Sequence, residues 1–375
     1  MLTAAGCNAR QHRLRTVLDQ QKIDAALFTD PREIYYFTGM LTPDWLPDPA
    51  TLIIETHGGS WLASNSLETD ALVDERVAYV PNIGGTRNQD LHRQMVALLT
   101  QRLAGKHYAR IGWQSEATPR LIAETVDATT HPDTWIAIDD LVADQERTKD
   151  ADEIECLRLS IACTLAAYDA AQLAIAPNVT ELIVLAAGQR SACLRAGKQV
   201  IHSGDYRCGE PGGPARDHPL GHNDLYIIDA WSHVDGYWSD LCRTFAVEQI
   251  TPLQAEVYRH LADILLEVEG HLAPGLPGTE LWRWIDGRIR EHPHLREVGL
   301  SHHAGHGVGL RAHEGPDLNP NRGPELRPGD VISVEPGAYT PELRPGFRLE
   351  NMFLITEHGC ELLSSYPLTL ERLSS

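Results

Sequence analysis

Apolar and polar residues alternate most clearly between Tyr226 and Thr244, where two apolar runs flank the dipeptide Asp235-Gly236. An Asp-Gly pair suits the positive φ values of a two-residue turn, so this pattern predicts a β-hairpin. Such a turn places Asp240 opposite Trp231, and Trp231 shares a face with Asp229 because side chains alternate with a period of two. Two carboxylates on one buried face are costly unless a cation compensates their charge. The hairpin therefore suggests a metal site.

Each aspartate also has a simpler structural explanation. Asp229 would then end a strand, and Asp240 would pair with Arg243 on a solvated edge. Isolated acids are common on protein surfaces, so the metal site needs further ligands elsewhere in the chain.

Between Gln11 and Glu146, short apolar runs alternate with helical segments, which predicts an α/β domain. We expect helices at residues 11–21 and 89–103, and strands at residues 25–28, 51–55, 60–63, 77–80, 109–113 and 134–138. The stretch 139–152 is rich in charge and lacks apolar periodicity, which predicts a linker and a domain boundary near Arg147.

Beyond this linker, the order helix, helix, acidic hairpin occurs twice. Apolar residues three or four apart predict a first helix with one buried face, and these are Ile154, Leu157, Ile161, Leu165 and Tyr168. We expect further helices at residues 180–196, 251–269 and 279–292, an irregular segment at 203–222, and strands at 331–335 and 347–356. Thr251, Pro252 and Gln254 form a strong helix start. The repeated order predicts an α+β domain whose two helix-helix-hairpin halves face one site.

Composition sets limits on the class of protein. A length of 375 residues exceeds what one hydrophobic core usually supports, so we expect two domains, at residues 1–147 and 148–375. The formal net charge of −20 argues against nucleic acid or an anionic membrane as partner. The seven cysteines are scattered and form no Cys-x-x-Cys motif, which is typical of reduced thiols in a cytoplasmic protein. No apolar run is long enough to span a bilayer.

The segment Ser301 to Glu314 is rich in histidine and glycine. His306 and His313 lie seven residues apart, with Gly305, Gly307 and Gly309 around the first. Glycines let the backbone adopt unusual dihedrals and come close to a ligand, so this segment is a candidate ligand loop. Chance clustering on a polar loop is the alternative, and it is stronger for His302 and His303 than for His306 and His313.

Two glutamates on apolar strands complete the set. Glu335 and Glu350 are joined by a loop too long to fix their register, and a surface ion pair with Arg348 is the alternative for Glu350. The candidate metal ligands are Asp229, Asp240, His306, Glu335 and Glu350. Four carboxylates balance the charge of two divalent ions, and oxygen-rich ligation with one nitrogen suits Mn²⁺, Co²⁺, Fe²⁺ or catalytic Zn²⁺.

These motifs, in this order, resemble those of the pita-bread metallopeptidases, in the branch of aminopeptidase P, prolidase and creatinase. The stretch Arg13 to Gly39 also resembles the amino-terminal domain of that branch, so the resemblance covers nearly the whole chain. It implies an α/β amino-terminal domain, a pita-bread carboxyl-terminal domain, a homodimer and metal-assisted hydrolysis. By this resemblance, Glu335 is a metal ligand that also shuttles a proton, and His313 contacts substrate and stabilises the oxyanion. Arg348 would orient Glu350.

The chain departs from the family pattern in two places. Pro211 and Gly212 stand where the family has an upstream histidine that binds the peptide, and Trp231 stands where the family has glycine. The candidates to replace the histidine are His202, His218 and His222. Trp231 is expected to narrow or reshape the site.

The main hypothesis is therefore a dinuclear Xaa-Pro aminopeptidase or dipeptidase. The departures keep open a second one, a hydrolase or lyase that acts on a small non-peptide molecule in the manner of creatinase or a sulfonium lyase. A catalytically silent scaffold is the third, and five intact ligands argue against it.

Overall fold

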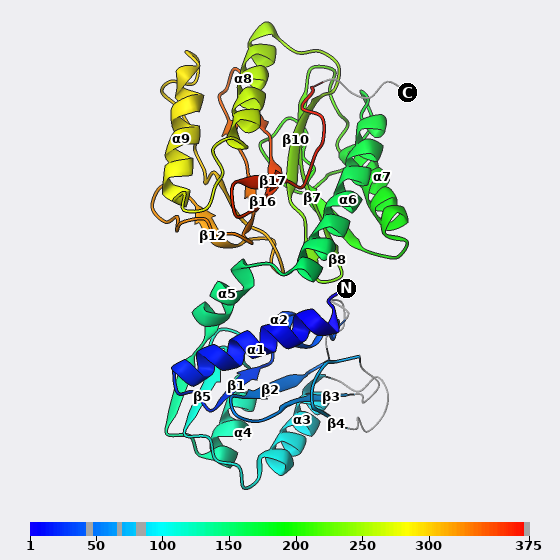
Figure 1. The fold of residues 1–375 in the computed structure, drawn as a ribbon. Helices are drawn as coiled ribbons and strands as arrows, with labels where there is room; N and C mark the ends of the chain where they lie inside the picture. Colours follow the sequence, from blue (N-terminus) through cyan, green and yellow to red (C-terminus); the bar gives the residue numbers. More distant parts are fainter. Residues whose placement is uncertain (43–47, 66–69, 80–87, 371–375) are drawn as a thin grey trace. The chain divides into compact units, whose positions relative to one another are not determined.

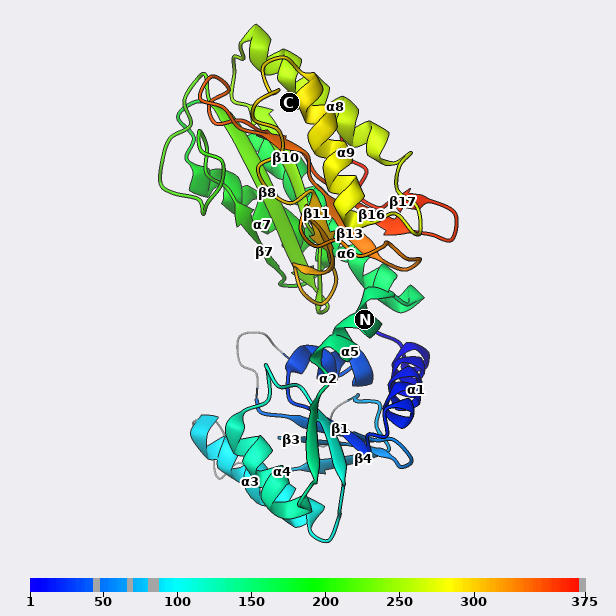
Figure 2. The ribbon, with the colours of Figure 1, turned by 90° about the vertical axis from the view of Figure 1, so that its left-hand side faces the viewer.

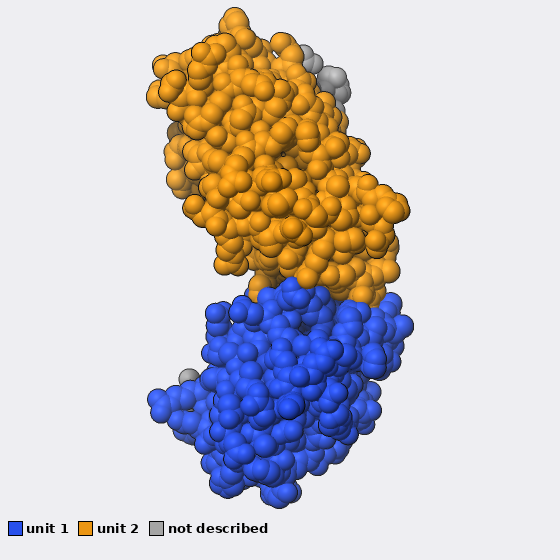
Figure 3. All heavy atoms as spheres, turned by 60° about the vertical axis from the view of Figure 1, so that its left-hand side comes forward, with its two compact units in different colours: residues 1–145 blue, residues 146–375 orange. Residues whose placement is uncertain are grey.

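The computed structural model describes residues 1–42, 48–65, 70–79 and 88–370 (Figure 1). The chain forms two compact units, Met1–Gln145 and Glu146–Ser375, which are coloured separately in Figure 3. Each unit has a hydrophobic core of its own. Among the described helices, none has both the length and the apolar character needed to cross a membrane.

The amino-terminal unit is an α/β domain, as predicted. Its six strands are β1 (Ala25–Phe28), β2 (Thr51–Glu55), β3 (Ser60–Ser64), β4 (Glu75–Ala78), β5 (Arg110–Trp113) and β6 (Thr134–Ala137), in the sheet order β4-β3-β2-β1-β5-β6. The helices are α1 (Ala4–Gln20), α2 (Pro31–Thr38), α3 (Asn88–Leu103), α4 (Arg120–Thr130) and α5 (Asp139–Arg147). The expected strand at 77–80 begins two residues earlier, and Val80 lies outside the described residues.

The prediction of a linker from residue 139 was wrong for its first part, because residues 139–147 form helix α5. Asp139 and Asp140 lie in its first turn and Arg147 in its last, which complements the helix dipole. Val142 is buried. One buried valine in nine residues is too weak a periodic signal to reveal a helix this short. Helix α4 was also not predicted.

The first half of the carboxyl-terminal unit carries the predicted hairpin. Helices α6 (Ala151–Ala174) and α7 (Glu181–Ala196) precede strands β7 (Ile201–Asp205), β8 (Leu225–Val234), β9 (Tyr237–Trp238) and β10 (Leu241–Ala246). Asp235 and Gly236 both adopt positive φ, 51° and 81°, as the two-residue turn requires. Cys242 lies opposite Asp229, and Trp238 lies opposite His233, so the predicted register is confirmed.

Strand β7 lies partly inside the segment that was predicted to be irregular. It pairs with β8 at the sheet edge, with Gly204 opposite Ala230. A Cβ atom at Gly204 would collide with the backbone carbonyl oxygen of Asp229, so only glycine permits this close approach. The sequence Ile-His-Ser-Gly-Asp has low strand propensity, which explains why the pattern did not indicate a strand.

The second half repeats the order. Its helices are α8 (Pro252–Val268) and α9 (Gly278–Glu291), and its strands are β11 (Gly305–Gly307), β12 (Glu314–Leu318), β13 (Val331–Val334), β14 (Gly337–Ala338), β15 (Phe347–Arg348), β16 (Asn351–Ile355) and β17 (Cys360–Leu362). Strands β13 and β16 pair with Val334 opposite Asn351, and β14 and β15 pair with Gly337 opposite Arg348. Glu335 and Glu350 lie between these pairs, on opposing segments. The structure thus supplies the register that the loop length left open.

The strands of both halves lie between two layers of helices (Figures 1 and 2). Helices α6 and α7 cover one side and α8 and α9 the other. Buried apolar side chains of α8 and α9, such as Leu261 and Ile285, pack in one core with Ile332 and Phe353 of the second sheet. This packing fixes the strands that carry the acidic side chains.

Helix α8 begins with the predicted capping box, in which Gln254 N–H donates to Thr251 Oγ1 at 3.2 Å and Thr251 N–H donates to Gln254 Oε1 at 2.8 Å. Replacing Thr251 by alanine removes one of these bonds and should lower the free energy of unfolding by about 1 kcal/mol. Thr251→Ser keeps the acceptor and should stay near the wild-type value in urea unfolding. Equal losses in both variants would show that the cap does not stabilise the helix.

Candidate metal centre

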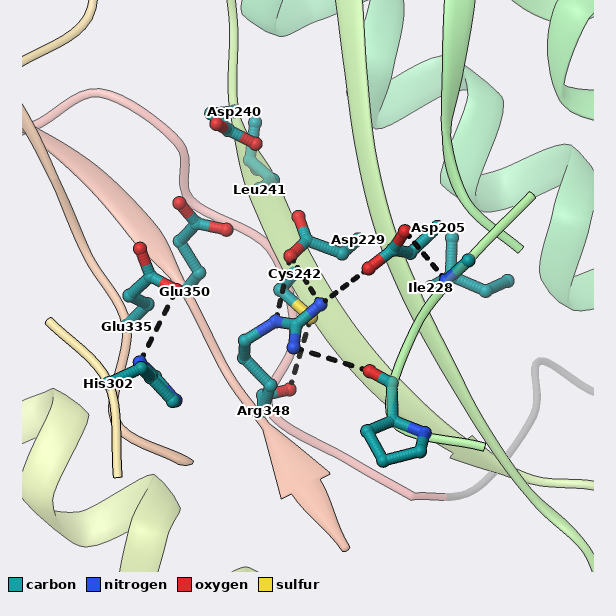
Figure 4. A network of polar contacts seen from close by, with 12 residues as sticks. Asp205, Ile228, Asp229, Asp240, Leu241, Cys242, His302, Glu335, Arg348 and Glu350 are labelled. Carbon is teal, nitrogen blue, oxygen red and sulfur yellow. Dashed lines mark hydrogen bonds and ion pairs between the residues drawn. The ribbon is translucent and has the colours of Figure 1, made fainter. Parts of the chain in front are cut away.

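A pocket of about 480 Å³ lies in the carboxyl-terminal unit, where the two halves meet. Four carboxylates line it and turn toward one space (Figure 4). Asp229 comes from β8 and Asp240 from the gap between β9 and β10, whereas Glu335 follows β13 and Glu350 precedes β16. Each half therefore supplies two acids.

The five predicted ligand residues form two overlapping clusters. Ligand atoms of Asp229, Asp240 and Glu350 lie within 4.8 Å of one another, as do those of His306, Glu335 and Glu350. His306 Nε2 lies 3.6 Å from Asp240 Oδ2 and 3.7 Å from Glu335 Oε1. Glu350 belongs to both clusters, which is the arrangement expected of a carboxylate shared by two cations.

The four carboxylates give the pocket an excess of negative charge, which bound cations would balance. Asp240 and Glu350 are buried, and this burial, together with repulsion from the neighbouring carboxylates, raises the pKa of both well above the usual range. Burial also raises the pKa of Asp229 to about 6, although the nearby Arg348 partly opposes this shift. Hard oxygen ligands with one imidazole fit divalent ions such as Mn²⁺, Co²⁺, Fe²⁺ or catalytic Zn²⁺. The donor set and its excess negative charge thus fit two such ions.

The protonation and orientation of the His306 imidazole suit a nitrogen ligand. Burial lowers the pKa of its imidazole to about 4, which keeps the ring neutral. Its Nδ1 lies 3.0 Å from the carbonyl oxygen of Gly307, so Nδ1 carries the proton and the Nε2 lone pair faces Asp240 and Glu335. The ring of His313 stacks on that of His306, with centroids 3.6 Å apart. His313 therefore lines the same pocket.

One hydrogen bond and one close ion-pair contact orient the glutamates. Ser333 donates its hydroxyl to Glu350 Oε1. Burial alone would raise the pKa of Glu335, but its contact with His303 and the charge of the nearby histidines lower it overall. His303 Nδ1 lies 3.2 Å from Glu335 Oε1.

The structure corrects the predicted partner of Arg348. Its Nε donates to Asp229 Oδ2 at 2.7 Å, and its Nη2 donates to Asp205 Oδ2 at 3.0 Å (Figure 4). It also donates to the carbonyl of Pro211 and to the Tyr339 hydroxyl. Arg348 belongs to β15, which pairs with β14 and ends before Glu350, so its side chain extends toward the first half instead of toward Glu350.

Trp231 lies on the same face of β8 as Asp229, as predicted. It is not among the described residues that line the pocket. Its ring packs edge-on against Trp238, with centroids 4.7 Å apart. Trp231 therefore does not narrow the pocket by direct contact. The expectation that it reshapes the site stays a prediction. Strand alternation fixes the face of a side chain, whereas packing decides its direction along the strand.

None of the three suggested replacement histidines lines the pocket. His222 pairs with Glu248 at 2.8 Å, His218 is exposed, and His202 is buried beside Tyr206. The pocket is instead lined by His302, His303 and Tyr339, which the pattern did not select. A usable signal was present, because His302 and His303 lie just before His306 in the same glycine-rich segment.

Two helix-helix-hairpin halves that bring four carboxylates and an imidazole to one pocket define a metallohydrolase of the pita-bread fold. The chain belongs to metallopeptidase family M24, whose model matches residues 155–357, more than half of its length. The Creatinase/Prolidase N-terminal domain matches residues 10–146.

Individual relatives agree with this assignment. The chain is 26% identical over 368 residues to the Xaa-Pro dipeptidase of Pyrococcus furiosus, covering 95% of this chain and 97% of that protein. It is 32% identical over 173 residues to the uncharacterized peptidase YqhT of Bacillus subtilis, covering 46% of this chain and 47% of that protein. The crystal structure of the prolidase from Pyrococcus horikoshii OT3 shares the fold, with a TM-score of 0.76 and 23% identity over 96% of this chain and 99% of that one.

Arg348→Met should destabilise the metal-free protein by about 3 kcal/mol, because it leaves the Asp229 and Asp205 carboxylates without their cation. Arg322→Met is the matched control, since the Arg322 side chain is 80% exposed, and it should cost less than about 1 kcal/mol. Urea unfolding measures both. A loss at Arg348 no larger than that at Arg322 would contradict the account of this network.

Proposed function

We propose that this chain is a dinuclear metal-dependent Xaa-Pro peptidase that acts as a dipeptidase or an aminopeptidase. The observation that carries the proposal is the convergence of the two clusters on one pocket, with Glu350 common to both. The similarity to the Xaa-Pro dipeptidase of Pyrococcus furiosus along nearly the whole chain supports this substrate class.

We assign one ion to Asp229, Asp240 and Glu350, and the other to His306, Glu335 and Glu350. Manganese is our first choice, and cobalt, iron and zinc suit the same ligands. When bound, such ions polarise the substrate carbonyl and lower the pKa of a water molecule. The protein side chains then position the substrate and move the proton.

Glu335 is placed to accept a proton from the attacking water and to deliver it to the departing nitrogen. His313 lies beside His306 at the pocket wall, where its N–H can stabilise the developing oxyanion. Arg348 keeps Asp229 in place through the 2.7 Å hydrogen bond.

His303 is the residue that we add to the substrate-binding groups. Its Nδ1 is buried against Glu335, while 37% of its side chain is exposed. Because Nδ1 is buried, the exposed fraction belongs to other atoms of the side chain, and His303 lines the pocket. We place a polar group of the substrate against this side chain.

A second candidate remains, a hydrolase or lyase for a small non-peptide molecule. It is favoured by Pro211, which lines the pocket at the position where the family has a peptide-binding histidine. A catalytically silent scaffold is disfavoured, because carboxylates held this close together would lower the stability of a protein that binds no metal.

We also propose a cytoplasmic homodimer. The seven cysteines are all free thiols, which suits a reducing compartment. Dimerisation follows from the family resemblance alone, and light scattering at several protein concentrations measures it.

The proposed activity is tested by incubating Mn²⁺-loaded protein with Xaa-Pro dipeptides, Xaa-Pro-Xaa tripeptides, and small amides, amidines and sulfonium compounds. We expect hydrolysis at the Xaa-Pro bond that chelation abolishes. Asp240→Ala should lower kcat/KM by more than about 100-fold, because it removes a ligand. Asp263→Ala, at an exposed position of α8, should leave it unchanged. Metal-loaded protein that cleaves no peptide but acts on a small compound would favour the second candidate.

His303→Gln should lower kcat/KM for the best substrate by about 10–100-fold, because the imidazole contact with the carboxylate of Glu335, a proposed metal ligand, is lost. His218→Gln is the matched control, because His218 is exposed and away from the pocket. Steady-state kinetics on both variants decides. Equal values for the two would remove His303 from the substrate-binding groups.

A further inference from the structure

A buried chain of hydroxyl groups lies behind the hairpin that carries Asp229 and Asp240. Thr164 of α6 contacts two serines of the hairpin, with its Oγ1 at 2.7 Å from Ser232 Oγ and 2.8 Å from Ser239 Oγ. All three residues are fully buried. Ser239 immediately precedes Asp240 in the chain.

The backbone ladder of the hairpin changes at Ser239. Ser239 N–H donates to the Ser232 carbonyl at 3.0 Å, as in a regular antiparallel pair. Ser232 N–H, however, donates to the Ser239 side-chain hydroxyl at 3.0 Å. The next N–H, that of Asp240, points away from β8, as expected beside a hydrogen-bonded pair, and donates to Met352 Sδ at 3.2 Å. The register with β8 is the same on both sides of Ser239 and Asp240, but between β9 and β10 a side-chain hydroxyl replaces one backbone acceptor of the ladder.

The hydrogen bonds of this chain can all run in one direction. In that arrangement the Ser239 hydroxyl, which also lies 3.3 Å from the Ser232 carbonyl oxygen, donates to Thr164. Thr164 donates to Ser232, and Ser232 donates to His202 Nδ1 at 3.0 Å. His202 Nε2–H then donates to the Tyr206 hydroxyl at 2.8 Å. Burial lowers the pKa of His202 to about 4, so its ring is neutral and has the acceptor nitrogen that this order requires.

Helix α6 also holds the hairpin one turn to either side of Thr164. Ser160 donates to the Tyr237 carbonyl at 2.8 Å, near the hairpin turn. The Tyr168 hydroxyl lies 2.9 Å from the carbonyl oxygen of Ile228 and 2.5 Å from that of Leu241. Ile228 precedes Asp229, and Leu241 follows Asp240. The contacts of Thr164 and Tyr168 thus flank the aspartates, whereas the contact of Ser160 lies farther from them.

Simple packing does not account for this arrangement. Apolar side chains would fill the space between a helix and a sheet at no cost in desolvated hydroxyls. A regular hairpin would also need no side-chain acceptor at Ser239. The hydroxyls lie where the Ser232 N–H has a side-chain acceptor in place of a backbone one, directly beside Asp240, which lines the pocket.

We propose that Thr164, acting through Ser239 and Ser232, is a positioning residue that holds Asp240 in the orientation needed to bind the metal ions. The inference rests on the proposed function, because it concerns a ligand of the same site. Loss of the Thr164 hydroxyl would let the Ser239 side chain rotate and would loosen the backbone that precedes Asp240.

The test compares the binding of Mn²⁺ alone to metal-free Thr164→Val, Thr164→Ser and unaltered protein by calorimetric titration. Valine has the shape of threonine without the hydroxyl, so Thr164→Val should bind Mn²⁺ about tenfold or more weakly. Thr164→Ser keeps the hydroxyl and should restore the affinity to within about threefold. Ser160→Ala, on the same helix, should lower thermal stability but leave Mn²⁺ affinity unchanged.

Circular dichroism checks that each variant folds, and Ser239→Ala replaces Thr164→Val if the latter does not. Unchanged Mn²⁺ affinity in a folded hydroxyl-free variant, or an equal loss in Ser160→Ala, would overturn the inference while leaving the proposed function intact. Absence of Mn²⁺ binding by the unaltered protein would instead overturn the proposed function, and the inference with it.

Discussion

Mutual repulsion among Asp229, Asp240, Glu335 and Glu350 is the constraint on which the rest of the carboxyl-terminal unit depends. These acids line one pocket, and burial raises the pKa of Asp240 and Glu350 well above the usual range. Among the described residues that line the pocket, the arginine is Arg348, which already pairs with Asp229. Like charges at this spacing destabilise a fold unless cations neutralise them. The geometry is therefore best understood as a site whose stable state includes bound metal.

The fold resists this repulsion by fixing each strand from outside the pocket. Gly204 lets β7 approach the backbone of Asp229, and the opposing segments of the second half fix Glu335 against Glu350. Helix α6 supplies hydroxyls to the first hairpin, while α8 and α9 pack on the second sheet. Each acid is thus held by backbone or by a buried hydrogen bond, so the pocket can stay open for ligands.

Local chemistry made part of this site predictable. Asp235-Gly236 fixes a two-residue turn, and the turn sets the register that brings Asp229 and Asp240 to one face. Features that depend on tertiary packing were not predictable. The direction of the Trp231 side chain depends on its packing against the Trp238 ring, and Arg348 donates to Asp229, on a strand distant in sequence. His303 was not predicted, because chance clustering of histidines on a polar loop explains it equally well, whereas the glycines around His306 favour a ligand.

Two divalent ions in this pocket would neutralise its four carboxylates. Anomalous diffraction from crystals grown with Mn²⁺, recorded on both sides of the manganese absorption edge, detects such ions without reference to activity. We expect two manganese peaks about 3.5–4 Å apart, one beside Asp229 and Asp240, one beside His306 and Glu335, and both beside Glu350. Fully ordered carboxylates with no manganese peak between them would contradict the proposed two-ion site.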